Sequence, residues 1–218
     1  MRRPSGSVAV AAVVVAACAA ATARAGDAAA PSSSAPSAAR CAGDRYKVRN
    51  LLDPAAADVS LRPRRATVRG LRGLEAPRRV TGSTPRLRPV EYRTYRVRAP
   101  LVAGRRLPTG DIVLVVGRPP ATMHVVFPDT HVCEDIVSGI MGQEIHVASD
   151  EVENLCGVMP TKRWRRLGGR AEIVGVGFVA APGAPGLVGA APNRLEIHPA
   201  VSFAATSRCR GVPGTVPA

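Results

Sequence analysis

Five short segments with the residue pattern of β-strands constrain the fold of this chain most. They are rich in Val and Ile and are separated by Gly, Pro and Asp, which favour turns. The five segments are residues 90–103, 111–116, 122–127, 171–180 and 194–204. The second and third flank a Gly-Arg-Pro-Pro sequence, which predicts a β-hairpin. A chain of 218 residues with this pattern is long enough for one domain with a core.

The segment after residue 130 has helical rather than strand periodicity, because its apolar residues recur at spacings of three or four. It predicts one helix, or two helices broken at Gly139–Gly142, with a stop at Cys156-Gly157. A helix between the third and fourth of five strands is the arrangement of an OB-type barrel. We therefore predict a β-rich, α+β fold, with a small five-stranded OB-like barrel over residues 90–205. A twisted open sheet with one helix is the alternative.

Residues 41–89 precede the predicted barrel and contain five prolines, which interrupt regular elements. We expect an extended arm there, with one short helical turn that begins at Thr67, whose hydroxyl would cap the following backbone. Residues 206–218 are expected to form a C-terminal tail. Only seven aromatic residues occur in the chain, so aliphatic side chains must fill the core.

The first 25 residues have the pattern of a signal peptide. Two arginines precede an apolar run over residues 8–23, which is shorter than the roughly 20 residues that a membrane-spanning helix needs. One cleavage position lies before Cys18, which makes Cys18 a candidate lipidation site, and the other lies after residue 25. Residues 26–40 are rich in Ala, Ser and Pro and predict a disordered linker. We expect the protein in the extracellular space or the cell envelope, on a membrane only through a lipid anchor.

Four further cysteines, at positions 41, 133, 156 and 209, remain after export. An even number in an oxidising compartment predicts two disulfides, for which three pairings exist. We favour Cys133 with Cys156, which would bracket the helical segment. Cys41 would then pair with Cys209 and join the two ends of the domain.

Zinc binding is the alternative to disulfide formation for two of these cysteines. His131, Cys133, His146 and Cys156 are all residue types that bind zinc. Their spacing matches none of the common zinc patterns. We therefore predict no metal site and no other cofactor.

The net charge of +14 comes almost entirely from arginine, since 28 of the 30 basic residues are Arg. Residues 61–100 hold twelve of them, with too few aromatic residues for base stacking along the stretch. Such charge attracts an anionic partner, although a merely solvated basic surface is the alternative. Candidate binding residues are Arg93, Arg96 and Arg98 on the first strand and Asn193 before the last strand. Turn geometry alone also explains Asn193.

Glu196 and His198 are the best candidates for catalytic residues. They lie two residues apart on a predicted strand and therefore on the same face, where the carboxylate could polarise the imidazole for proton transfer. Asp111, His124 or Asp129 could join them if the predicted hairpin packs alongside. The alternative is a hydrogen bond that completes the end of an edge strand.

Two motifs resemble those of an uncharacterised family of bacterial secreted proteins. They are Gly-Val-Gly-Phe at residues 175–178 and Ala-Pro-Asn-x-x-Glu-x-His-Pro at residues 191–199, and the likeness extends over residues 41–205. The chain departs from the family at Val113 and Val126, where similar proteins usually carry His and Glu. The resemblance implies secretion and brings no established activity with it.

The leading functional hypothesis is a secreted or envelope-tethered noncatalytic binding module, with an anionic envelope polymer or protein as its partner. The first alternative is a secreted hydrolase, a nuclease-like phosphodiesterase that uses Glu196 and His198. That alternative depends on fold analogy alone. The second is a structural component of an envelope assembly.

Overall fold

The computed structural model describes residues 40–75, 77, 79–181, 188–207, 209 and 211. The predicted signal peptide, Cys18, linker residues 26–39 and most of the predicted tail lie outside these residues. Within the described residues, no helix has the length and apolar character needed to cross a bilayer.

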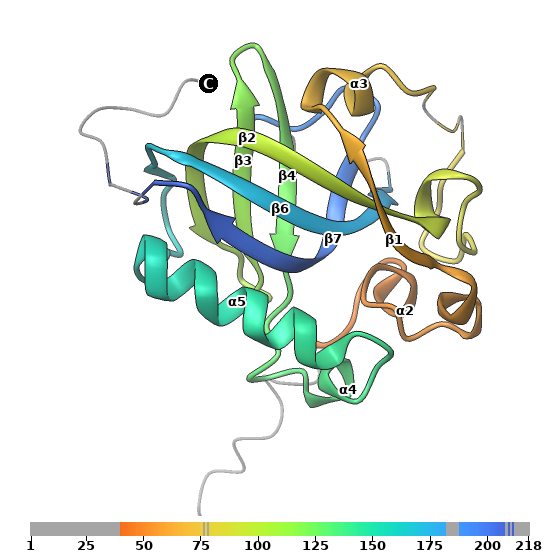
Figure 1. Cartoon of the computed structure of the whole chain (residues 1–218). Coiled ribbons are helices and arrows are strands. Elements are labelled where there is room, and N and C mark those ends of the chain that lie inside the picture. The colour runs from red at the N-terminus through yellow and green to blue at the C-terminus, as the bar shows by residue number, and fades with distance from the viewer. Residues whose placement is uncertain are drawn as a thin grey trace, which may run out of the picture. The chain divides into compact units, whose positions relative to one another are not determined.

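A closed five-stranded mixed β-barrel lies at the centre of the described chain (Figure 1). Its strands are β2 (Arg93–Arg106), β3 (Ile112–Arg118), β4 (Ala121–Phe127), β6 (Arg170–Val179) and β7 (Leu195–Ala205). Strand β2 pairs antiparallel with β3 and with β6, β3 pairs with β4, and β6 pairs with β7. A parallel pairing of β4 with β7 completes the ring. The predicted OB-like barrel is confirmed, and each strand lies close to its predicted bounds.

The predicted hairpin is formed by β3 and β4, which pair along their whole lengths. Gly117 has a positive φ of 122°, and a Cβ atom there would lie 2.4 Å from the Ala121 carbonyl oxygen, so a side chain does not fit at this turn. Strand β3 is buried on both faces: Leu114 and Val116 belong to the main core, while Val113 and Val115 point away from it. This two-sided burial explains why the segment is a continuous apolar run rather than an alternating one.

The helical segment consists of two helices, α4 (Glu134–Val137) and α5 (Gly142–Cys156), so the two-helix alternative is confirmed. Helix α5 lies beside β7 at one end of the barrel (Figure 1). Ala148 and Val152 of α5 pack into the main core. The helix ends before Gly157, whose φ of 72° suits glycine, as the sequence predicted.

The arm contains more regular structure than its sequence predicts. It forms α2 (Tyr46–Arg49), a 3-10 turn (Pro54–Asp58), strand β1 (Ser60–Ala66) and α3 (Val68–Arg72), and a second 3-10 turn (Val90–Tyr92) then leads directly into β2. The predicted helical turn is α3, and the Thr67 hydroxyl accepts a hydrogen bond from the Gly70 amide at 3.0 Å. Strand β1 was not predicted. It pairs in parallel with β2, and the short strand β5 (Arg165–Arg166) also pairs with β2.

A buried ion pair fixes the arm to the barrel. The Glu91 side chain is 0% exposed and accepts hydrogen bonds from both terminal nitrogens of Arg45, at 2.7 and 2.5 Å. It also accepts a hydrogen bond at 2.9 Å from the amide of Val179, at the end of β6. A second arm arginine, Arg86, donates to the Asp53 carboxylate. These arginines therefore stabilise the fold from inside.

Two disulfides form, but the favoured pairing is wrong: Cys41 pairs with Cys133 and Cys156 pairs with Cys209. The physical reason is the length of α5. Cys133 precedes α4 and Cys156 ends α5, which has 15 residues and is therefore about 22 Å long. A disulfide needs Cα atoms within roughly 7 Å, so these two cysteines cannot meet. The two disulfides indicate an oxidising, extracellular environment.

Candidate functional site

Two depressions that share Arg98 lie on the outer surface beside β2. The larger, of about 400 Å³, is lined by residues of α3, β2, the β3–β4 hairpin and β6. The smaller, of about 200 Å³, is lined by residues of β1, β2 and β6 and by Thr67. We call the two together the arginine groove, after its charged lining residues Arg65, Arg69, Arg96, Arg98, Arg118, Arg170 and Glu172.

Strand register brings the groove arginines together. Arg65 of β1 pairs with Arg96 of β2, and Arg98 pairs with Glu172 of β6. Because side chains alternate along a strand, Arg96 and Arg98 point outward while Val97 between them is fully buried. Charged side chains of three neighbouring strands therefore face the same surface.

Glu172 is the acidic residue that lines the groove. Its carboxylate accepts a hydrogen bond from Nε of Arg98 and lies 3.6 Å from Nη1 of Arg96. The hydrogen bond from Arg98 holds the pKa of Glu172 below its usual value, so this carboxylate stays ionised. Within the described chain, no carboxylate lies at ion-pair distance from Arg69, Arg118 or Arg170. The groove therefore keeps a strong positive charge.

The structure separates the predicted binding residues. Arg96 and Arg98 line the groove, whereas Arg93 is half-buried beside Tyr95 at the start of β2. The buried Asn193 amide donates to the carbonyl oxygens of Leu71 and Leu74, which links the end of α3 to the turn before β7. Its contacts are those of a structural residue.

Four groove residues were not among the binding residues predicted from the sequence: Arg65, Arg69, Arg118 and Arg170. These arginines come from four separate elements, and no spacing along the chain relates them. The pairing of β1, β3 and β6 with β2 brings Arg65, Arg118 and Arg170 together, and the packing of α3 against β4 adds Arg69.

The outer face of β3 and β4, where OB-type barrels often bind ligands, is covered by other parts of this chain. His124 hydrogen-bonds through Nε2 to the Val188 carbonyl at 3.0 Å and stacks on Trp164. Gly189 lies so close to Val115 that a Cβ atom there would be 2.3 Å from a methyl carbon. The arginine groove, beside β1 and β6, is thus on a different surface from the usual one.

Glu196 and His198 interact, with Glu196 partly exposed and the imidazole of His198 buried. His198 Nδ1 lies 3.1 Å from Glu196 Oε1, and the Phe178 ring packs against the imidazole with a centroid distance of 5.6 Å. Only 3% of His198 is exposed, and among the described residues its buried Nε2 has no hydrogen-bond partner. A substrate therefore cannot reach this imidazole in the structure described here.

The three predicted additions to this pair have other partners. Asp111 accepts a hydrogen bond at 3.0 Å from the Asp129 amide, and Asp129 forms an ion pair with Arg40 at 2.7 Å. His124 is held by the Val188 carbonyl. In the described part of the chain, none of the three hydrogen-bonds to Glu196 or His198.

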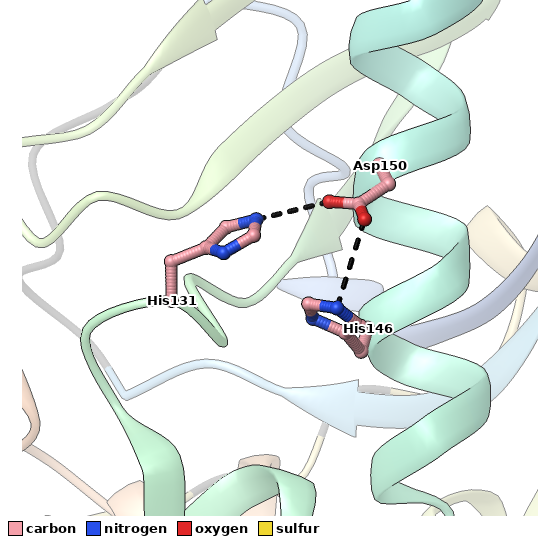
Figure 2. Close-up of side chains that lie close together, drawn as sticks. All are labelled: His131, His146 and Asp150. Atoms are coloured by element: carbon pink, nitrogen blue, oxygen red, sulfur yellow. Dashed lines mark hydrogen bonds and ion pairs between the residues drawn. The ribbon is translucent and has the colours of Figure 1, made fainter. Parts of the chain in front are cut away.

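The four residues of the zinc interpretation do not come together, because Cys133 and Cys156 lie in different disulfides. The two histidines do meet, and Asp150 of α5 lies between them (Figure 2). His131 Nε2 lies 3.0 Å from Asp150 Oδ1, and His146 Nε2 lies 3.6 Å from Oδ2.

The sequence matches no protein-family model and no curated protein. The resemblance to secreted bacterial proteins therefore stays a prediction.

Proposed function

We propose that this protein is a noncatalytic binding module that holds an anionic polymer in the arginine groove. One observation carries the proposal: six arginines from five elements line two adjoining depressions against one carboxylate. Guanidinium groups pair with phosphate, sulfate and carboxylate groups through two parallel hydrogen bonds, so such a surface suits a chain of repeated negative charges.

The residues that line the arginine groove also indicate the chemical class of the partner. No aromatic side chain lines either depression among the described residues, so bases of a nucleic acid would find no stacking platform. Recognition would therefore depend on the charged backbone of the partner. An anionic polymer of the cell envelope fits this requirement.

The lining favours binding over catalysis. It contains neither an imidazole nor a thiol in the described chain, and its carboxylate is engaged by Arg98. The alternative hydrolase would have to use Glu196 and His198, and the buried imidazole of His198 weighs against it. Secretion and tethering to the envelope stay predictions from the sequence, and the two disulfides support the extracellular environment alone.

A salt titration with dextran sulfate tests the proposal. Wild-type protein should bind the polymer at about 50 mM salt, and the logarithm of the binding constant should fall linearly with the logarithm of salt concentration. Substituting Arg98→Ala and Arg118→Ala together should weaken binding on the order of tenfold and lower the salt slope by about one per lost contact.

The matched control is the double substitution Arg79→Ala and Arg163→Ala. Both arginines are exposed and lie outside the groove, and the double variant loses the same charge. Binding close to the wild-type level in this control supports the groove as the site. Equal losses in the two double variants, or no binding by the wild type at low salt, would contradict the proposal.

A further inference from the structure

The loop before α4 and one side of α5 bring two imidazoles and a carboxylate to one point (Figure 2). The candidate ligand atoms of His131, His146 and Asp150 all lie within 4.8 Å of one another. Zinc bonds to nitrogen and oxygen ligands are about 2.0 to 2.2 Å long, so a single ion can reach all three atoms after small side-chain movements. The side chains are 61%, 29% and 42% exposed, respectively, so an ion can enter from solvent.

The positions of these groups are fixed by the surrounding structure. His146 and Asp150 lie four residues apart on α5 and therefore on the same face of the helix. His131 lies in a loop that the disulfide of Cys133 with Cys41 anchors two residues later. The three groups are thus presented by a helix and a cross-linked loop.

Thr130 provides His146 with the kind of hydrogen-bond partner that metal-binding histidines usually have. Its hydroxyl is 2.8 Å from Nδ1 of His146, and the residue is 3% exposed. With Nδ1 engaged by the hydroxyl, the Nε2 atom of His146 is the one that faces Asp150. In metal sites, the ring nitrogen that does not bind the metal is commonly hydrogen-bonded in this way, which orients the ring.

We propose that His131, His146 and Asp150 form a binding site for a divalent transition-metal ion such as Zn²⁺. Two nitrogen ligands and one oxygen ligand suit this class of ion, whereas Ca²⁺ and Mg²⁺ prefer oxygen ligands. Water would complete the coordination. The site uses no residue of the arginine groove and does not depend on the proposed function.

Calorimetric titration with ZnCl₂ tests the proposal on the full disulfide-bonded protein after chelator treatment. Wild-type protein should bind one equivalent of zinc. His131→Ala and Asp150→Asn should each weaken binding at least tenfold, and Thr130→Val should weaken it by roughly 10- to 100-fold through loss of the orienting hydrogen bond.

Glu151→Gln is the matched control, because it removes a carboxylate adjacent to Asp150 on the same helix. This variant should bind zinc as the wild type does. Circular dichroism spectra of all variants establish that they remain folded. An absence of zinc uptake by the wild type at about 100 μM would overturn the proposal. Binding that survives in both His131→Ala and Asp150→Asn would overturn it as well, because the ion would then bind elsewhere.

Discussion

Buried Arg45 of the arm and exposed Arg98 of the groove differ in how many partners they have. The five N–H donors of Arg45 are all engaged, with the Glu91 carboxylate and with the carbonyl oxygens of Thr84, Pro85 and Val179. Arg98 is 74% exposed and has one carboxylate partner, Glu172. The same residue type therefore stabilises the fold in one region and leaves hydrogen-bond donors available in the other. Net charge alone does not distinguish the two uses.

The largest expected effect is the loss of stability on breaking the buried ion pair of Arg45 with Glu91. Glu91→Gln leaves the Arg45 charge buried without a counter-charge, which should lower the free energy of unfolding by about 3 to 5 kcal/mol. Denaturant unfolding followed by circular dichroism measures this loss. Glu172→Gln, which removes a carboxylate from the solvent-accessible groove, should leave the unfolding midpoint nearly unchanged. If Glu91→Gln lowered the free energy of unfolding by less than about 1 kcal/mol, the buried ion pair would contribute no more to stability than an exposed ion pair does.

A smaller effect is expected at the helix cap that positions part of the groove. Thr67→Ala removes the hydrogen bond to the Gly70 amide and should cost about 1 kcal/mol of stability. Because α3 carries Arg69, the same change should also weaken dextran sulfate binding modestly. Thr67→Ser keeps the hydroxyl, so both its stability and its affinity should remain close to those of the wild type. Equal losses in the two variants would rule out the cap as the cause.

The smallest expected effect is a gain in affinity. Glu172→Gln removes the negative charge from the groove and should strengthen dextran sulfate binding a few-fold at neutral pH. The hydrogen bond from Arg98 lowers the pKa of Glu172, so its carboxylate is ionised at neutral pH and becomes protonated only as pH falls through the lowered value. The difference in dextran sulfate affinity between wild type and Glu172→Gln should therefore be the same at pH 7 and at pH 5. An affinity that does not change on substitution would show that the polymer does not bind near Glu172.

The barrel could be predicted from sequence because its signals are local. The strand segments, the hairpin turn and the change to helical spacing after residue 130 can all be identified from neighbouring residues. Strand β1 could not be predicted, because its sequence Ser-Leu-Arg-Pro-Arg-Arg-Ala has no alternating apolar face and its side chains are mostly exposed. Two further features join residues far apart in the chain and therefore have no local signal. They are the ion pair of Arg45 with Glu91 and the disulfide connectivity.

The candidate sites were predictable only in part, for the same reason. Strand alternation identified Arg96 and Arg98, whereas the other groove arginines depend on which strands pair. The zinc interpretation included His131 and His146 but not Asp150. The available signal was the spacing of four residues between His146 and Asp150 on a predicted helix, which places both side chains on one face.

The contacts of the arm decide where a shorter recombinant fragment could begin. A fragment that started at Val90 would carry Glu91 without Arg45, and Cys133 would have an unpaired thiol. It would also lack β1 and with it Arg65, one wall of the groove. Since Arg40 contributes the ion pair with Asp129, the shortest fragment that retains all these contacts begins no later than Arg40.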